Sequence, residues 1–141
     1  IQVQTTYTGS FGDIALAADA ATAHVAAGAD VLTGTAEMVV GAVSVARDNH
    51  ALWFGTQANQ TSLAPDIVVA SQVYHWEVLL RPIVADIDAG TPNGRALVAT
   101  LADGGLVIEY NTAYPLADPV KQRAEQLIAD IKSGALVVPA G

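Results

Sequence analysis

The sequence of 141 residues contains no cysteine and few charged side chains. The absence of thiols excludes a disulfide scaffold, a thiolate nucleophile and a cysteine zinc site. Only 6 lysine and arginine residues stand against 14 acidic residues, which gives a formal net charge of -8. Nucleic-acid binding depends on clustered basic side chains that release counterions, so this balance argues against a nucleic-acid partner.

Long apolar runs are also lacking, although 52% of the residues are hydrophobic. No charge-free stretch reaches the length of about 18 residues that a transmembrane helix needs. The apolar content itself excludes intrinsic disorder, and the length predicts one compact domain over residues 1–141. There is no initiator methionine or signal peptide, and Ile1 begins directly in a strand-like pattern. We therefore interpret the sequence as part of a longer polypeptide.

Short apolar runs alternate with alanine-rich helical runs along the chain. Strands are expected over residues 1–8, 29–33, 51–55, 67–70, 96–101, 106–110 and 135–139. Helices are expected over residues 14–27, 38–49, 71–89 and 118–133. The third helix contains Pro82, which predicts a kink or a break, and a turn at 102–105 predicts a hairpin between two strands. This succession indicates an α/β fold with a mostly parallel sheet and helices on both faces.

Ligands of such sheets bind outside the carboxyl ends of the strands. The loops at those ends are residues 9–13, 33–37, 56–60 and 71–76, and most of their side chains are small or polar. Our candidate ligand-binding residues come from these loops: Phe11, Thr35, Glu37, Gln57, Asn59, Tyr74 and Trp76.

Each candidate has a structural alternative. Phe11 is either a stacking platform or a core residue, and Glu37 is either a ligand acceptor or an acid favoured by a helix dipole. Gln57 and Asn59 bind ligand or stabilise their own turn. In the last loop, Trp76 shares the apolar spacing of its helix and is expected in the core. Tyr74 lies off that stripe, which favours a pocket or interlobe role.

The ordered motifs of the chain resemble one family. They are Tyr7-Thr8-Gly9-Ser10-Phe11-Gly12-Asp13, Gly28-Ala29-Asp30-Val31, Phe54-Gly55-Thr56-Gln57-Ala58-Asn59-Gln60, Ser71 before a long helix, Asp103-Gly104-Gly105 and the tail from Ile131 to Pro139. This set resembles the basic membrane protein family of ABC-transporter substrate-binding lipoproteins, which includes purine nucleoside receptors. The resemblance implies a type I periplasmic-binding-protein lobe, with the N-terminal lobe of the family absent from this chain. It also implies an extracytoplasmic or lipid-anchored parent protein that docks on an ABC permease.

The family's pocket residues match this chain unevenly. Phe11 matches the aromatic residue that stacks on the purine. The two acids of the family's Gly-x-Asp-x-Asp-Gln stretch are Gln57 and Asn59 here, and a ribose-binding lysine is Tyr74. A carboxylate accepts from two vicinal hydroxyls, whereas a carboxamide both donates and accepts. The hypothesis that follows is a free purine or a similar flat, uncharged heterocycle as ligand.

Two other functions remain open as alternatives: an α/β enzyme domain, or the effector-binding half of a repressor-like regulator. An enzyme is disfavoured because these loops hold no Ser-His-acid set and no phosphate clamp. His24, His50 and His75 lack metal-ligand spacing, so we expect neither a metal nor a cofactor. An isolated lobe would expose its interlobe face, which predicts self-association.

Overall fold

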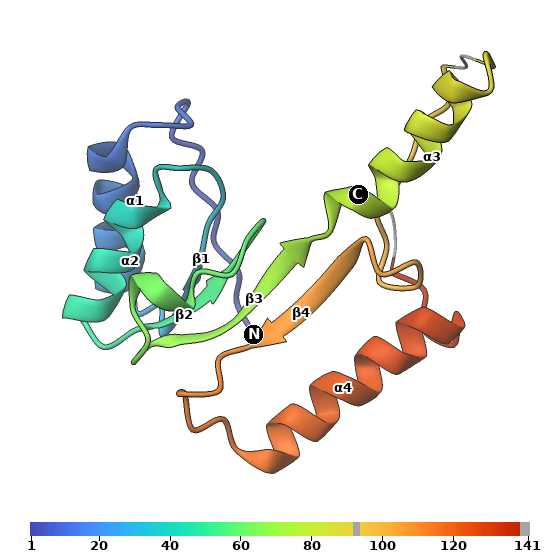
Figure 1. The fold of residues 1–141 in the computed structure, drawn as a ribbon. Coiled ribbons are helices and arrows are strands. Elements are labelled where there is room, and N and C mark those ends of the chain that lie inside the picture. The colour runs from blue at the N-terminus through green and yellow to red at the C-terminus, as the bar shows by residue number, and fades with distance from the viewer. Residues whose placement is uncertain (92–93, 139–141) are drawn as a thin grey trace. The chain divides into compact units, whose positions relative to one another are not determined.

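The computed structural model describes residues 1–91 and 94–138 (Figure 1). Its elements in chain order are α1 (Ile14–Ala26), β1 (Val31–Thr33), α2 (Val39–Asp48), β2 (Leu52–Gly55), the short 3-10 helix η1 (Thr61–Leu63), β3 (Val68–Tyr74), α3 (Trp76–Asp88), β4 (Leu106–Tyr110) and α4 (Asp118–Ser133). The contacts divide the chain into two compact units. The first unit comprises Ile1–Gln72 with Ile108–Pro115, and the second comprises Val73–Val107 with Leu116–Gly141. That residues 1–141 form a single lobe stays a prediction.

The strands form one sheet in the order β1-β2-β3-β4. β1 pairs in parallel with β2, and β2 pairs in parallel with β3. At the end of β4, the Asn111 amide donates to the Val69 carbonyl at 3.0 Å, and its buried side chain donates to the Val68 carbonyl at 2.7 Å. The predicted α/β fold with a mostly parallel sheet is confirmed. That helices also cover the second face stays a prediction for α3 and α4, which belong to the second unit.

Three expected strands are wrong where the structure describes them. Residues 1–8 form no strand, and Tyr7 is 93% exposed, because their alternating pattern has no neighbouring strand to satisfy its backbone groups. Residues 96–101 form no strand either, and β4 pairs with β3 instead. Residues 135–138 fold back on the end of α4, where the Leu136 amide donates to the Asp130 carbonyl at 3.0 Å. Pro139, the last residue of that expected strand, lies outside the described residues.

The expected helix over residues 71–89 is also partly wrong. β3 continues to Tyr74, so residues 71–74 are strand and the helix α3 begins only at Trp76. The helix runs through Pro82 without a break, since the fixed φ of proline is itself helical and only one backbone bond is lost; a kink at Pro82 stays a prediction.

The first unit is built around a core beneath β2. Trp53 and Val68 are completely buried in it. α1 and α2 lie side by side in Figure 1 and pack against each other, and α2 also packs on β2. The two helices approach each other closely at Gly41, where a side chain would not fit: a Cβ on Gly41 would collide with the backbone carbonyl oxygen of Ile14. The helices are thereby held at a fixed distance beside the sheet.

In the second unit, the Asp103 carboxylate accepts hydrogen bonds from two backbone amides of its own turn. It accepts from the Gly105 amide at 2.7 Å and from the Thr100 amide at 3.0 Å. The bond from Gly105, followed by those from Thr100, holds the pKa of Asp103 below its ordinary value of 3.8. This compact turn replaces the expected strand pairing of residues 96–101.

A pH dependence follows from that lowered pKa. Its stabilising contribution is present above pH 3.8 and is lost as the pH falls through the lower pKa of the folded state. We expect an NMR titration of the Asp103 carboxyl carbon to give a midpoint below 3.8, and the Asp103→Ala variant to lose part of the acid dependence of stability. A midpoint at or above 3.8 would contradict the described bonding.

Candidate functional site

Three loops of the first unit are tied together where β1 and β2 end. The Thr33 hydroxyl donates to the Phe54 carbonyl at 2.8 Å, and the Thr56 hydroxyl donates to the Gly34 carbonyl. The Met38 amide donates to the Phe11 carbonyl at 3.1 Å, which adds the loop before α1. The carboxyl ends of the parallel strands therefore share one polar rim, as the strand-end rule predicts.

Two residues of this rim have left-handed backbone conformations. Ala36 has φ 71° and Gln57 has φ 70°. This conformation costs a residue with a Cβ about 1–2 kcal/mol. The Ala36 amide donates to the side-chain Oε1 of Gln57 at 3.1 Å, so the two strained residues hold one another. Such strain persists only where the surrounding structure over-determines it, and it is frequent at functional sites.

The rim encloses an open depression of about 540 Å³, a size that suits a small ligand. Its lining residues are Phe11, Gly12, Ala36, Glu37, Val39, Val40, Thr56, Gln57, Ala58 and Gln60. The predicted residues Phe11, Glu37 and Gln57 thus lie together, from three separate loops. The Phe11 side chain is 80% exposed, so its alternative role as a core residue is wrong.

Gln60 organises the third loop, and sequence reasoning missed it. Its Oε1 accepts from the buried Trp53 indole at 2.7 Å, and its Nε2 donates to the Thr56 carbonyl at 2.9 Å. Its backbone amide donates to the hydroxyl of Ser71 at 3.1 Å. A buried tryptophan usually needs a hydrogen-bond acceptor for its indole N–H, so Trp53 in an expected strand was the signal in the sequence that pointed to a nearby acceptor such as Gln60. The loop is therefore anchored to the core and not only to its neighbours.

Ser71 has a different place from the one expected. It is completely buried within β3 and does not belong to a loop after that strand. A Cβ on Gly55 would collide with the Ser71 hydroxyl, so glycine is required where β2 ends. This close packing shapes the floor beneath the loop of residues 56–60.

Thr35 and Asn59 are exposed residues of the rim that do not line the depression. The Oδ1 of Asn59 accepts from the Thr61 amide at 3.0 Å, and its Nδ2 donates to Glu109 at 2.6 Å. These bonds are those of a turn-stabilising residue, the structural alternative for Asn59.

Tyr74 and Trp76 belong to the second unit. Their ring centroids lie 5.1 Å apart with the planes inclined at 47°, a tilted aromatic pair. Trp76 is 58% exposed in this unit, in contrast to the core position that its spacing predicted. Tyr74 is half-buried, so the exposed part of this pair is mainly Trp76, at the start of α3.

Other kinds of site are not formed by the described residues. Within residues 1–91 and 94–138, no group of three or more His, Asp or Glu side chains is placed to hold a metal ion. No helix in the described part of the chain is long and apolar enough to span a membrane.

The chain is similar to one protein family and to several solved structures. A family model described as "ABC transporter substrate-binding protein PnrA-like" matches residues 1–140. The structure is similar to an ABC transporter system solute-binding protein from Conexibacter woesei DSM 14684, with a TM-score of 0.71 and 25% identity, over 96% of this chain and 46% of that one. No match was found among curated proteins.

Two further solved structures are similar in fold. One is an ABC transporter system solute-binding protein from Aeropyrum pernix K1, with a TM-score of 0.76 and 20% identity, over 96% of this chain and 48% of that one. The other is a transcriptional activator of the comK gene from Bacillus halodurans, with a TM-score of 0.79 and 18% identity, over 94% of this chain and 47% of that one. At these identities the similarity shows the fold alone. The chain spans about half the length of each structure that it matches.

Proposed function

Since the chain belongs to the PnrA-like family of ABC-transporter substrate-binding proteins, we propose that its first unit forms one wall of a binding site for a small flat heterocycle. The family membership confirms the resemblance inferred from the ordered motifs. The observation that carries the proposal is the exposed Phe11 ring beside the depression, together with Glu37 and Gln57. Any planar ring can stack favourably on an exposed aromatic face. The polar groups of the rim would then hydrogen-bond to the edge of the ligand ring and decide which rings bind.

We propose a purine base, or a close relative, as the ligand of this wall. Gln57 stands where the family resemblance implies an acid that holds ribose hydroxyls. Its Oε1 already accepts from the Ala36 amide, so it has little acceptor capacity left for a diol. This supports a free base over a ribonucleoside.

The rest of the site is proposed to come from outside this chain. The solved relatives are about twice as long, which supports a two-lobed protein that closes around its ligand and then docks on an ABC permease. The stripe of α3 formed by Trp76, Leu80, Ile83, Val84 and Ile87 is exposed in the described structure. We propose that the other lobe covers it and that the isolated chain self-associates. A monomer by light scattering would contradict that part.

A binding role is proposed in place of catalysis. The Thr56 hydroxyl, the only hydroxyl lining the depression, donates its hydrogen to the Gly34 carbonyl and is therefore not bonded to a general base as an activated nucleophile would be. As a transport receptor, the parent protein is proposed to lie outside the cytoplasm, either in the periplasm or anchored to the membrane by lipid.

Calorimetry on the complete gene product tests the proposed function. Adenine, hypoxanthine, adenosine and inosine would be titrated under the same conditions. We expect the free bases to bind more tightly than the nucleosides. Tight nucleoside binding with weak base binding would overturn the choice of free base, and no binding of any of the four would overturn the purine assignment.

A further inference from the structure

The amide of Gln57 has a fixed orientation. A backbone N–H can only donate, so the atom that accepts from Ala36 must be the carbonyl oxygen Oε1. The Nε2 group then points elsewhere, and it makes no hydrogen bond with another described residue. In the depression, Gln57 therefore offers donors to a ligand.

The other polar side chains of the depression are already engaged, except one. The Thr56 hydroxyl donates to the Gly34 carbonyl, and both ends of the Gln60 amide are bonded within the unit. The exposed carboxylate of Glu37 makes no hydrogen bond or ion pair with another described residue. A ligand thus meets donors from Gln57 and a negatively charged acceptor from Glu37.

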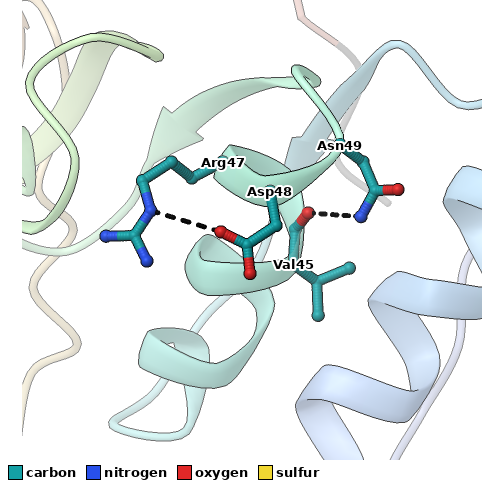
Figure 2. A network of polar contacts seen from close by, with 4 residues as sticks. All are labelled: Val45, Arg47, Asp48 and Asn49. Atoms are coloured by element: carbon teal, nitrogen blue, oxygen red, sulfur yellow. Dashed lines mark hydrogen bonds and ion pairs between the residues drawn. The ribbon is translucent and has the colours of Figure 1, made fainter.

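The charge of the first unit is strongly negative. Arg47 is its only lysine or arginine, against seven acidic residues. Glu37 lies just before the start of α2 and Arg47 lies near its end, about 12 Å along the helix axis from the first helical residue, Val39. There its Nε lies 3.5 Å from the Asp48 carboxylate, beside the bond from Asn49 to the Val45 carbonyl (Figure 2). The only lysine or arginine of the unit is therefore remote from the depression and already paired.

The helix starts near the depression do not supply positive charge either. The Asp13 carboxylate accepts from the Ala15 amide at 3.0 Å and the Leu16 amide at 3.1 Å, which occupies the start of α1. Glu37 stands two residues before α2. An acid at each helix start opposes the partial positive charge that would otherwise favour an anion.

From these contacts we infer that this wall selects a neutral or cationic flat ligand, with an acceptor toward Gln57 and at least one N–H toward Glu37, and rejects anions. Glu37 is the specificity-determining residue, since it supplies both the acceptor and the repulsion. The inference rests on the proposed function and adds a charge rule that stacking on Phe11 cannot supply, because a ring face stacks on anionic and neutral heterocycles alike.

Two purines of similar shape test the inference on the complete gene product. Adenine is neutral at pH 7 and carries an amino group, whereas urate is an anion. We expect the Glu37→Gln variant to bind adenine about tenfold more weakly and to narrow the adenine-to-urate affinity ratio by about tenfold or more. The matched control is Asp19→Asn, which removes one exposed acid of the same unit outside the depression and should leave the ratio unchanged.

A second variant examines Gln57. The Gln57→Glu side chain keeps an acceptor for the Ala36 amide but replaces the donors, so adenine affinity should fall by about tenfold or more. Circular dichroism and thermal melts would establish that each variant is folded. If adenine binds but Glu37→Gln leaves the ratio unchanged, the charge rule is overturned while the proposed function stands. If neither purine binds the unmodified protein, the purine assignment itself fails.

Discussion

Phe11→Ala is expected to weaken adenine binding by about tenfold to a hundredfold while leaving thermal stability nearly unchanged. Stacking of a base on an aromatic side chain contributes about 1–3 kcal/mol, which corresponds to this range of affinity. Stability should hold because the ring is 80% exposed and contributes little to the core. Calorimetry and thermal melts of the complete gene product would measure the two quantities separately.

Tyr7→Ala is the matched control for this prediction. Tyr7 is an aromatic residue of the same segment, is 93% exposed and does not line the depression. Its removal should change neither affinity nor stability. An unchanged affinity in Phe11→Ala, or an equal loss in both variants, would show that the Phe11 ring is not the stacking surface.

The second large effect is expected on folding. Gly41→Ala should destabilise the chain by about 1–3 kcal/mol, although alanine at an ordinary helix position is favoured over glycine by about 1 kcal/mol. The added Cβ would meet the carbonyl oxygen of Ile14 and lie 2.9 Å from its Cγ2. Backbone cannot rotate away as a flexible side chain does, so α1 and α2 would have to separate. Urea unfolding followed by circular dichroism would measure the change.

Gly94→Ala provides the comparison, because a Cβ at Gly94 meets nothing within 4 Å and the residue lacks a positive φ. We expect that variant to be neutral or slightly stabilised. A neutral or stabilising Gly41→Ala would mean that the two helices separate at no cost, which contradicts the close packing in the first unit.

Much of the alternation of strands and helices was predictable from hydrophobic periodicity. Glu37 and Gln57 follow β1 and β2 as expected, whereas Phe11 was expected after a strand over residues 1–8 that does not form. The wrong strand predictions share a cause: an alternating pattern indicates that a segment can form a strand but does not determine which other strand it pairs with. Residues 1–8 have the alternating pattern of a strand but pair with no strand, and β4 pairs with β3 whereas residues 96–101 form no strand.

The bonding state of the site could not be predicted in the same way. The hypothesis that Gln57 both donates and accepts was drawn from its chemistry alone, and only the contact with Ala36 shows which end is already engaged. Gln60 was missed because its partners Trp53 and Ser71 come from two strands whose register no local pattern fixes. Long-range hydrogen bonds of this kind depend on the folded chain.

Residues 56–60 are anchored by side chains other than those exposed beside the depression, so support of the loop and contact with a ligand fall to different residues of the first unit. Gln60, Trp53 and Ser71 hold the backbone of the loop, whereas Phe11 and Glu37 are exposed and have little part in that support. Substitutions at Phe11 and Glu37 should therefore leave the fold and the stability of the first unit nearly unchanged, because neither side chain supports the loop.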